Sequence, residues 1–510
     1  MKKVRTNIKN HIFLIIIFVL MVFIQVIAFD FLKYDDTINI LKNRFFHPIS
    51  ASHAIQLWSH PFFRMYIPVT YSLWMGIGFL SKMIYHGRLD AGLFHLSNLL
   101  LHILNTLLVY LLLRKLLESK AEYLKKDVIP TASFFGALVF GMHPVQVEAV
   151  SWISCFRDLC SAFFSLTSIL LFIRFRSQDG TKSKLIWYGA AFSSFLLSVL
   201  SKPSAVIVPC VIVMLMLFID FDFKIFLKNI TGLVPWFIVS ALLTCVAMYV
   251  QPVSQASIST PFLYRPVIAA DAVLFYLKKI AWPFELCIDY GRTPGFVMKN
   301  SWPFGSFAML AGLFAALCFF KYKKELYLLS VLFLTGLLPV LGLIPFSHQS
   351  ISTVADRYLY LPMISVSLSL ASIICIKYSK KLVLCLFLLM SAYGILSFQQ
   401  CKVWKNTGTV MSHTLAYRPQ SFLANLNYGI FLASRNRFKQ AIHHYEIAQK
   451  IKPKNPLSYY NMAIAYACVN DFKSAQETYE KLARINQHMS EKLKNTLKSI
   501  KRIKKSRHFP

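Results

Sequence analysis

Residues 11–36 read HIFLIIIFVLMVFIQVIAFDFLKYDD, an apolar run from His11 to Phe29 that leads into three acidic residues. An apolar run of about 20 residues is long enough to cross the hydrocarbon core of a bilayer as a helix. Similar runs recur along the 510 residues, of which 56% are hydrophobic, and the mean hydropathy is +0.52. The sequence therefore predicts an all-α, polytopic helical bundle in a membrane.

The distribution of lysine and arginine sets the expected topology. Four basic residues precede the first run, so the positive-inside rule keeps the N-terminus in the cytoplasm and brings Asp35 and Asp36 out on the other side. We interpret the apolar stretch Tyr66–Ile84 as a juxtamembrane or re-entrant segment, because counting it as a span would move the next basic cluster outside. We expect about eleven spans and two long outer loops, at about 30–90 and 250–303. The predicted spans are His11–Phe29, Leu93–Leu113, Ala132–Met142 with its flank, Ile153–Ile173, Ile186–Leu200, Ser204–Phe221, Thr231–Tyr249, Gly305–Phe320, Leu326–Phe346, Tyr358–Ile376 and Leu382–Phe398.

The formal net charge of +33 does not indicate a nucleic-acid partner. The basic residues lie mainly in short loops between apolar runs and in the C-terminal tail, where positive-inside topology and anionic lipid account for them. No base-reading module accompanies them. The ten cysteines form no C-x-x-C pair and are interpreted as small packing residues, so we predict neither disulfides nor a metal site from them.

From about Gln400 the sequence becomes polar and shows a 34-residue repeat when Pro419 and Pro453 are aligned. A period of this length is typical of helical solenoids. Small and aromatic residues fall at tetratricopeptide consensus positions in both copies. They are Tyr428, Gly429, Ala441, Tyr445 and Ala448, and then Met462, Ala463, Ala475, Tyr479 and Leu482. We therefore predict a transmembrane domain at 1–399 and an extracytoplasmic tetratricopeptide α-solenoid at 400–510 that ends in a basic tail.

Asp35 and Asp36 are the candidate catalytic residues. A carboxylate pair held at a membrane surface suits proton abstraction from an acceptor hydroxyl beside a lipid-borne donor, with one carboxylate as general base and its neighbour orienting it. The alternative interpretation is a solvated pair that only marks the topology. A divalent cation could bind beside the pair, but one close carboxylate pair does not by itself establish a metal site.

A second polar cluster is expected at the outer junction of two spans, where His143, Glu148, Arg157 and Asp158 occur. His143 and Glu148 could bind an acceptor, and the planar guanidinium of Arg157 suits a phosphate. The alternative interpretation is interhelical hydrogen bonding with a local pair between Arg157 and Asp158. Lys202, between two spans, is another candidate phosphate contact, unless it only extends its ammonium group to the membrane interface.

Arg357 is the residue most readily assigned to a donor phosphate, with Asp356 as its orienting partner at the outer start of a late span. The alternative interpretation is a structural ion pair that caps a helix. His102 belongs to a polar stripe on one face of the second predicted span. Such stripes usually join helices to one another, although His102 could also contact substrate.

Taken in order, these motifs resemble the TMTC-type transmembrane and tetratricopeptide-containing proteins. The segments that carry the resemblance are Asn98-Leu-Leu-Leu-His102-Ile-Leu-Asn105, His143-Pro-Val-Gln-Val-Glu148-Ala-Val-Ser-Trp152, Arg157-Asp158, Ser201-Lys202-Pro203, Trp282-Pro283 through Asp289-Tyr290, and Asp356-Arg357-Tyr358-Leu-Tyr360-Leu-Pro362. Such proteins are similar to GT-C class glycosyltransferases, related to protein O-mannosyltransferases, which transfer a sugar from polyprenyl phosphate to protein hydroxyls outside the cytosol. By this resemblance Asp35 and Asp36 fall on the acidic motif of the first outer loop, and the repeats face the lumen or periplasm.

The resemblance implies an inverting, GT-C-like glycosyltransferase that moves a hexose such as mannose from a polyprenyl monophosphate to Ser or Thr hydroxyls of exported proteins. Asp35 or Asp36 is expected to be the base, and Arg357, with Arg157 or Lys202, to stabilise the phosphate leaving group. The expected partners are the lipid-linked sugar, the membrane and an exported polypeptide held by the repeats.

Two alternatives remain open. One is a non-catalytic membrane scaffold whose repeats collect partners for envelope assembly, and the other is a lipid-linked oligosaccharide polymerase or ligase. The compact chain, its two repeats and the lack of an endoplasmic-reticulum retention ending favour the cytoplasmic (inner) membrane of a bacterium, with the repeats in the periplasm.

Overall fold

The computed structural model describes residues 2–122, 124–220, 223–251, 260–299 and 302–506. Contacts divide the chain into two compact units. The first comprises Met1–Asp30, Asp35–Leu286 and Arg292–Trp404, and the second comprises Phe31–Tyr34, Cys287–Gly291 and Lys405–Pro510. The described residues form helices, turns and loops with one isolated bridge between Phe62 and Met65, which confirms the predicted all-α class. Parts of the second predicted outer loop (252–259 and 300–301) and of the basic tail (507–510) lie outside the described residues.

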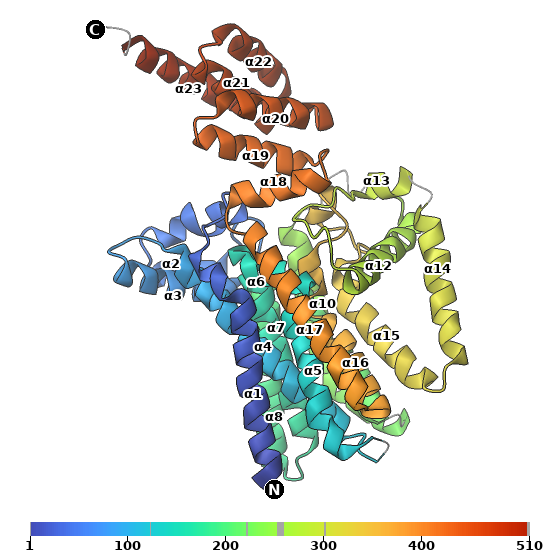
Figure 1. The fold of residues 1–510 in the computed structure, drawn as a ribbon. Coiled ribbons are helices and arrows are strands. Elements are labelled where there is room, and N and C mark those ends of the chain that lie inside the picture. The colour runs from blue at the N-terminus through green and yellow to red at the C-terminus, as the bar shows by residue number, and fades with distance from the viewer. Residues whose placement is uncertain (1, 123, 221–222, 252–259, 300–301, 507–510) are drawn as a thin grey trace. The chain divides into compact units, whose positions relative to one another are not determined.

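The first unit contains the long apolar helices that the sequence predicts as membrane spans (Figure 1). Among the described residues, six helical segments are long and apolar enough to cross a bilayer, and a seventh is present if one bent pair counts as a single span. The six segments are Ile8–Ala28, Ala91–Glu118, Ile153–Arg176, Thr181–Ser201, Ile230–Val250 and Lys380–Val403, and the bent pair is Lys126–Met142 with Pro144–Ser151. The chain is therefore a multi-pass membrane protein.

The helices of the first unit have the following bounds. They are α1 (Lys2–Phe23), α2 (Ala51–Ser59), α3 (Pro68–Ile84), α4 (Ala91–Glu118), α5 (Ile129–Met142), α6 (Val147–Ser151), α7 (Phe156–Arg176), α8 (Thr181–Ser201), α9 (Val208–Ile219), α10 (Phe223–Val250), α12 (Arg265–Ala281), α13 (Pro294–Lys299), α14 (Trp302–Ala316), α15 (Lys323–Leu337), α16 (Met363–Lys377) and α17 (Lys380–Val403).

Four of the predicted spans coincide with helices shorter than a full membrane crossing. Three of these are the apolar segments Pro203–Ile219, Phe304–Phe319 and Met363–Lys377, and the fourth is α15. Prolines limit two of them, because Pro339 follows α15 after one residue and Pro362 immediately precedes α16, and an interior proline removes a helical hydrogen bond and clashes with the preceding turn. The number of eleven spans therefore stays a prediction.

A bend between α5 and α6 brings Glu148 toward the candidate site. Pro144 follows the end of α5, and the chain continues through a 3-10 turn (η5, Pro144–Gln146) into α6 at an angle of 49°. Proline suits the first position of a new helix but cannot continue the old one. His143 caps the new turn, since its Nδ1 accepts a hydrogen bond from the backbone nitrogen of Val145 at 3.3 Å.

The polar stripe on α4 fastens this helix to the region where α6 gives way to α7. Asn98 Nδ2 donates to the carbonyl oxygens of Val150 at 3.2 Å and Trp152 at 2.9 Å, and Asn105 Nδ2 donates to Leu159 O at 2.9 Å. The carbonyl group of Val150 lies in the last turn of α6 and that of Trp152 just beyond it, where carbonyls lack helical partners, so the buried Asn98 amide satisfies them across the helix interface. The N-terminus of α7, which carries two candidate site residues, is thereby held in place.

The second unit is a series of helical hairpins with a 34-residue period (Figure 1). Its helices are α18 (Thr407–Tyr417), α19 (Phe422–Ser434), α20 (Phe438–Ile451), α21 (Pro456–Cys468), α22 (Phe472–Ile485) and α23 (Gln487–Ser506). The bounds of α21 and α22 are those of α19 and α20 shifted by 34 residues. The connecting loops repeat as well, because Asn436 and Asn470 occupy equivalent positions with φ values of 59° and 68°, a left-handed conformation that asparagine tolerates.

Candidate active site

Asp36 is a buried residue that fastens the segment after α1 to the turn that precedes α7. Its Oδ1 accepts hydrogen bonds from the backbone nitrogen of Ser154 at 3.1 Å and from Ser154 Oγ at 2.5 Å. The side chain has no exposed surface. A carboxylate that is buried and held by two donors is suited to positioning the loop rather than to collecting a proton from an incoming hydroxyl.

Asp35 lies in a different environment from its neighbour. Its side chain is 27% exposed, and its Oδ2 lies 3.8 Å from Arg157 Nη2. Partial burial raises the pKa of the Asp35 carboxyl, and the positive charges of Arg157 and Arg357 oppose that rise. Among the described residues no hydrogen-bond donor engages its side chain. Asp35 therefore combines an accessible carboxylate with a raised basicity, the two properties that a general base requires.

Asp158 joins two of the predicted phosphate contacts at the N-terminus of α7. Its Oδ1 is ion-paired with Lys202 Nζ, and its Oδ2 lies 3.8 Å from Arg157 Nε. Lys202 terminates α8, and its ammonium lies 5.5 Å from the centroid of the Tyr358 ring. The local Arg157–Asp158 pair is present, and Lys202 shares the same carboxylate. Two cations are thus held beside one buried anion, and Arg157 also lies beside the Asp35 carboxylate.

Arg357 forms a buried ion pair with Glu148. The backbone nitrogen of Arg357 donates to Glu148 Oε2 at 2.9 Å, and Nη1 donates to Oε1 at 2.5 Å. The guanidinium lies 5.3 Å from the centroid of the Trp152 ring and 5.0 Å from that of Tyr358. These contacts fix both the position and the plane of the guanidinium.

His348 completes this group, and the sequence analysis did not identify it. Its Nε2 lies 3.2 Å from Arg357 Nη2, so the unprotonated Nε2 accepts the hydrogen bond and the proton resides on Nδ1. Burial and the positive charges of Arg357, Arg157 and Lys202 hold the pKa of His348 well below its usual range. Nothing in the sequence around His348 signals this role, because the contact depends on how η11 (Ser347–Ser350) approaches η12 (Asp356–Leu359).

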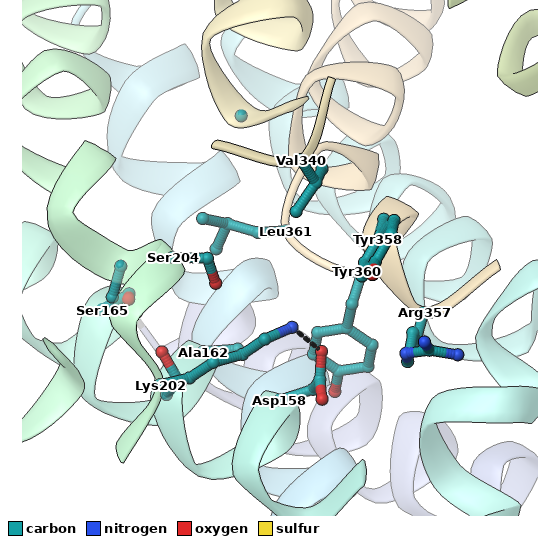
Figure 2. Close-up of a pocket in the computed structure, with 13 residues that line it drawn as sticks. Asp158, Ala162, Ser165, Lys202, Ser204, Val340, Arg357, Tyr358, Tyr360 and Leu361 are labelled. Atoms are coloured by element: carbon teal, nitrogen blue, oxygen red, sulfur yellow. Dashed lines mark hydrogen bonds and ion pairs between the residues drawn. The ribbon is translucent and has the colours of Figure 1, made fainter. Parts of the chain in front are cut away.

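A small cavity opens among these residues (Figure 2). Asp158, Lys202 and Arg357 contribute its charged lining, and Val340 and Leu361 contribute apolar lining. In Figure 2 the Lys202 and Asp158 side chains meet on one side of the cavity, and Val340 and Leu361 project from the other. Its volume of about 40 Å³ accommodates a few water molecules. An anionic group could be held at its mouth by two cations, whereas a sugar would have to lie outside it.

The remaining predicted residues lie at helix contacts or beside the cluster. His143 Nε2 donates to Ile280 O at 3.0 Å, and His102 bridges Gly141 O at 2.9 Å and the Tyr360 hydroxyl at 2.8 Å. Both imidazoles therefore join helices in this structure. Asp356 is 2% exposed and begins η12, and the carboxylate that binds Arg357 is Glu148, so an orienting role for Asp356 stays a prediction.

The structure thus brings together Asp35, Glu148, Arg157, Asp158, Lys202 and Arg357 from separate parts of the chain. No three His, Cys, Asp or Glu side chains converge as a metal-ligand set in the part of the chain that the structure describes. Binding of a divalent cation beside Asp35 stays a prediction.

The helices and this cluster define a class of protein: a multi-pass membrane protein with a largely buried cluster of three cations and three carboxylates. The chain is a distant relative of the TMTC-type protein O-mannosyl-transferases, which confirms the resemblance carried by its motifs. It is 23% identical over 509 residues to the human protein O-mannosyl-transferase TMTC3, a match that covers 88% of this chain and 52% of the human protein.

Two further relatives give the same result. The match to Drosophila melanogaster protein O-mannosyl-transferase Tmtc3 has 23% identity over 525 residues and covers 88% of this chain and 56% of that protein. The match to Caenorhabditis elegans protein O-mannosyl-transferase F38B6.6 has 22% identity over 447 residues and covers 82% and 60%. The chain thus spans about half the length of the curated relatives it matches. No protein-family model and no solved structure matches it.

Proposed function

We propose that this chain is a membrane glycosyltransferase that transfers a sugar, specifically mannose, from a polyprenyl monophosphate to Ser or Thr hydroxyls of exported proteins. The observation that carries the proposal is the grouping of an accessible carboxylate, Asp35, with the three cations Arg157, Lys202 and Arg357. The names of the relatives supply the reaction class and the sugar.

In the proposed reaction Asp35 acts as the general base. It takes the proton of the acceptor hydroxyl while the hydroxyl oxygen forms a bond to C1 of the sugar. The bond between C1 and the phosphate oxygen breaks on the opposite face, and its electron pair leaves with the polyprenyl phosphate, so the configuration at C1 inverts. Asp36 positions the loop that carries Asp35 through its bonds to Ser154.

The leaving phosphate gains one negative charge in this step, and cations already in place stabilise it without costly reorganisation. Lys202 and Arg357 line the cavity together with Asp158, and Arg157 contacts both Asp158 and Asp35. Val340 and Leu361 offer an apolar wall for the first part of the lipid chain. No further cofactor is required by this scheme.

The second unit supports an interpretation as tetratricopeptide repeats. The two hairpins share a 34-residue offset in all four helix boundaries, and Gly429 lies against Tyr445, where a Cβ atom would come within 2.5 Å of the ring. We propose that these repeats lie on the outer side of the membrane, as the charge pattern of the loops predicts, and hold the acceptor polypeptide. The bacterial inner membrane stays a prediction from the sequence.

The test is the glycan mass on exported proteins, measured by intact glycoproteomics in cells that express the wild-type chain or the Asp35→Asn variant at equal levels. We expect the variant to lose a defined hexose from Ser or Thr. The matched control is Glu118→Gln, which alters a carboxylate that is 46% exposed and pairs only locally with Arg114.

Other outcomes would favour the two alternative functions, a polymerase or ligase acting on glycans and a non-catalytic scaffold. Unchanged protein glycans together with altered lipid-linked or surface polysaccharide would replace the proposal with a polymerase or ligase acting on glycans. If neither class of glycan changed, the transferase proposal would be abandoned in favour of the scaffold.

A further inference from the structure

The second unit contains a pocket that the transferase site does not use. It has a volume of about 400 Å³ and lies between α19 and α20. Two residues of α19, Tyr428 and Leu432, form its apolar part. The rest of the lining comes from the start of α20 and the residue before it, namely Arg437, Lys439, Gln440, His443 and His444.

The lining of this pocket contains cationic and neutral side chains but no carboxylate. Arg437 and Lys439 are exposed, and among the described residues neither lies within ion-pair distance of an acidic side chain. His444 is held in place, because its Nδ1 lies 2.9 Å from Asn425 Oδ1 and its ring packs edge to face on Tyr428 at 4.9 Å between centroids. The pocket therefore has an aromatic wall held by these contacts and, at its rim, exposed cations that have no acidic partner in the described part of the chain.

The second repeat shows that the fold does not require this charge. At the positions 34 residues later, Asp471 replaces Arg437 and Glu477 replaces His443. Asp471 caps α22 by accepting a hydrogen bond from the backbone nitrogen of Ser474 at 3.0 Å, whereas Arg437 provides no side-chain cap to α20. An acidic or small polar residue stabilises a helix N-terminus and a cation does not. The first repeat thus forgoes a stabilising cap and carries a cation in its place.

We propose that the pocket between α19 and α20 binds an acidic segment of a polypeptide, with carboxylates against Arg437 and Lys439 and an apolar side chain against Tyr428 and Leu432. The mixed lining selects this ligand over a free phosphate, because Tyr428 and Leu432 provide apolar surface that a phosphate leaves uncovered and the volume is that of a small-molecule or peptide side-chain site. The choice of a polypeptide rests on the proposed function, which requires a protein acceptor. The pocket would therefore select acceptor polypeptides that carry an acidic segment.

The experiment is equilibrium binding of a short fluorescein-labelled peptide of Glu, Ser and Leu to the full-length protein in nanodiscs of zwitterionic lipid, followed by fluorescence anisotropy. A peptide with Gln in place of every Glu is the matched probe. We expect the acidic peptide to bind at least about tenfold more tightly, with an affinity that falls as salt is added, because the attraction is between exposed charges. Equal affinity for the two peptides would overturn the inference.

The assignment of Arg437 and His443 to the binding site is tested by replacing them with the acidic residues found at the equivalent positions of the second repeat. The double variant Arg437→Asp plus His443→Glu should weaken binding of the acidic peptide by at least about tenfold, and Arg437→Lys should preserve it. The matched control, Asp471→Asn plus Glu477→Gln, alters the equivalent positions of the other hairpin and should leave binding unchanged. If the double variant unfolds, as seen by circular dichroism, Arg437→Gln is used instead with the same expected direction. Unchanged binding in a folded variant would sink the assignment.

Two arms separate this inference from its alternatives. Displacement of the peptide by low millimolar inorganic phosphate would identify a phosphate site and overturn the polypeptide ligand. The Asp35→Asn variant should bind the peptide like the wild type, since Asp35 belongs to the other unit. Loss of transfer in this variant with intact peptide binding supports both proposals. If the wild type transfers the sugar but binds the acidic and Gln peptides equally, only the inference of an acidic-segment site is wrong, and the proposed transferase function stands.

Discussion

Arg357 and Glu148 are 209 residues apart in the sequence and form a two-point buried contact, at 2.9 Å from the backbone nitrogen and 2.5 Å from Nη1. The contact joins η12 to α6, the short helix that follows the proline bend. It therefore couples the geometry of the bend to the position of the principal candidate phosphate ligand.

Because this pair is buried, removing its carboxylate should lower the free energy of unfolding far more than removing an exposed carboxylate. Glu148→Ala leaves the Arg357 guanidinium buried without its partner, and we expect it to lower the free energy of unfolding by about 3–5 kcal/mol. Glu118→Ala removes the exposed pair with Arg114 and should change it by no more than about 0.5 kcal/mol. Thermal unfolding of both variants in the same detergent measures the difference. Equal melting temperatures would show that the Glu148–Arg357 contact is not a stabilising anchor.

We expect substitutions of the two neighbouring aspartates to have different effects, because Asp35 is proposed to be the catalytic base and Asp36 to position the loop. Asp35→Asn should reduce transfer by a factor of about 10²–10⁴ with little change in melting temperature, because it removes a general base and no hydrogen bond. Asp36→Ala leaves the nitrogen and hydroxyl of Ser154 without their acceptor and should cost about 1–3 kcal/mol of stability. Transfer assays combined with thermal unfolding distinguish the two. A reversed pattern would assign the base to Asp36.

The transfer rate should depend on pH through Asp35. The carboxylate must be deprotonated to act as base, and burial raises its pKa above the ordinary value of about 3.9. The rate should therefore be full above that raised pKa and fall as pH decreases through it. Because the charge of Arg157 opposes the rise, Arg157→Gln should raise the pKa further and move the acid limb to higher pH. A pH–rate profile of both proteins checks the sign, and a shift to lower pH would contradict it.

His348 is expected to be a positioning residue for Arg357. As a neutral acceptor it holds Nη2, so His348→Ala should lower kcat/KM for the lipid-linked donor by roughly tenfold, equivalent to a hydrogen bond to a charged group of about 1.5 kcal/mol. His348→Gln retains an acceptor and should recover part of the loss. The KM for the acceptor serves as internal control, because a merely structural role would alter both substrates. Equal effects of His348→Ala on the kinetics for the donor and for the acceptor would exclude a specific role of His348 in positioning Arg357.

A fifth test concerns the packing of the repeats. Alanine is the stronger helix former, yet a Cβ at Gly429 would lie 2.5 Å from the Tyr445 ring. We expect Gly429→Ala to destabilise the protein by about 1–3 kcal/mol through overpacking, despite a propensity gain of about 1 kcal/mol. The equivalent residue of the second repeat is already Ala463, so Ala463→Gly should cost about 1 kcal/mol. Chemical unfolding monitored by circular dichroism compares them, and a stabilised Gly429→Ala protein would show that the ring moves freely.

Local features of the sequence were sufficient to predict the long apolar helices and the period of the repeats. The run from His11 to Phe29 predicts a span because the length of an apolar helix must match the thickness of the bilayer. The 34-residue period predicts a hairpin array, since each copy repeats the same small and aromatic positions at the same spacing. Both properties are carried by neighbouring residues, so they can be read before any tertiary contact is known.

The partners of the candidate site were decided only by the tertiary structure. The sequence suggests Asp356 as the companion of Arg357, a role that stays a prediction, but it gives no sign of the contacts that Arg357 makes with Glu148 and His348. Likewise the sequence does not distinguish Asp35 from Asp36, which differ because only one of them reaches Ser154. Ion pairing depends on distance and burial, and these follow from proline breaks and helix packing that bring remote segments together. The sequence by itself determined which charged groups are present and on which elements they lie, and the packing of those elements determined which of them bind one another and which remains open to substrate.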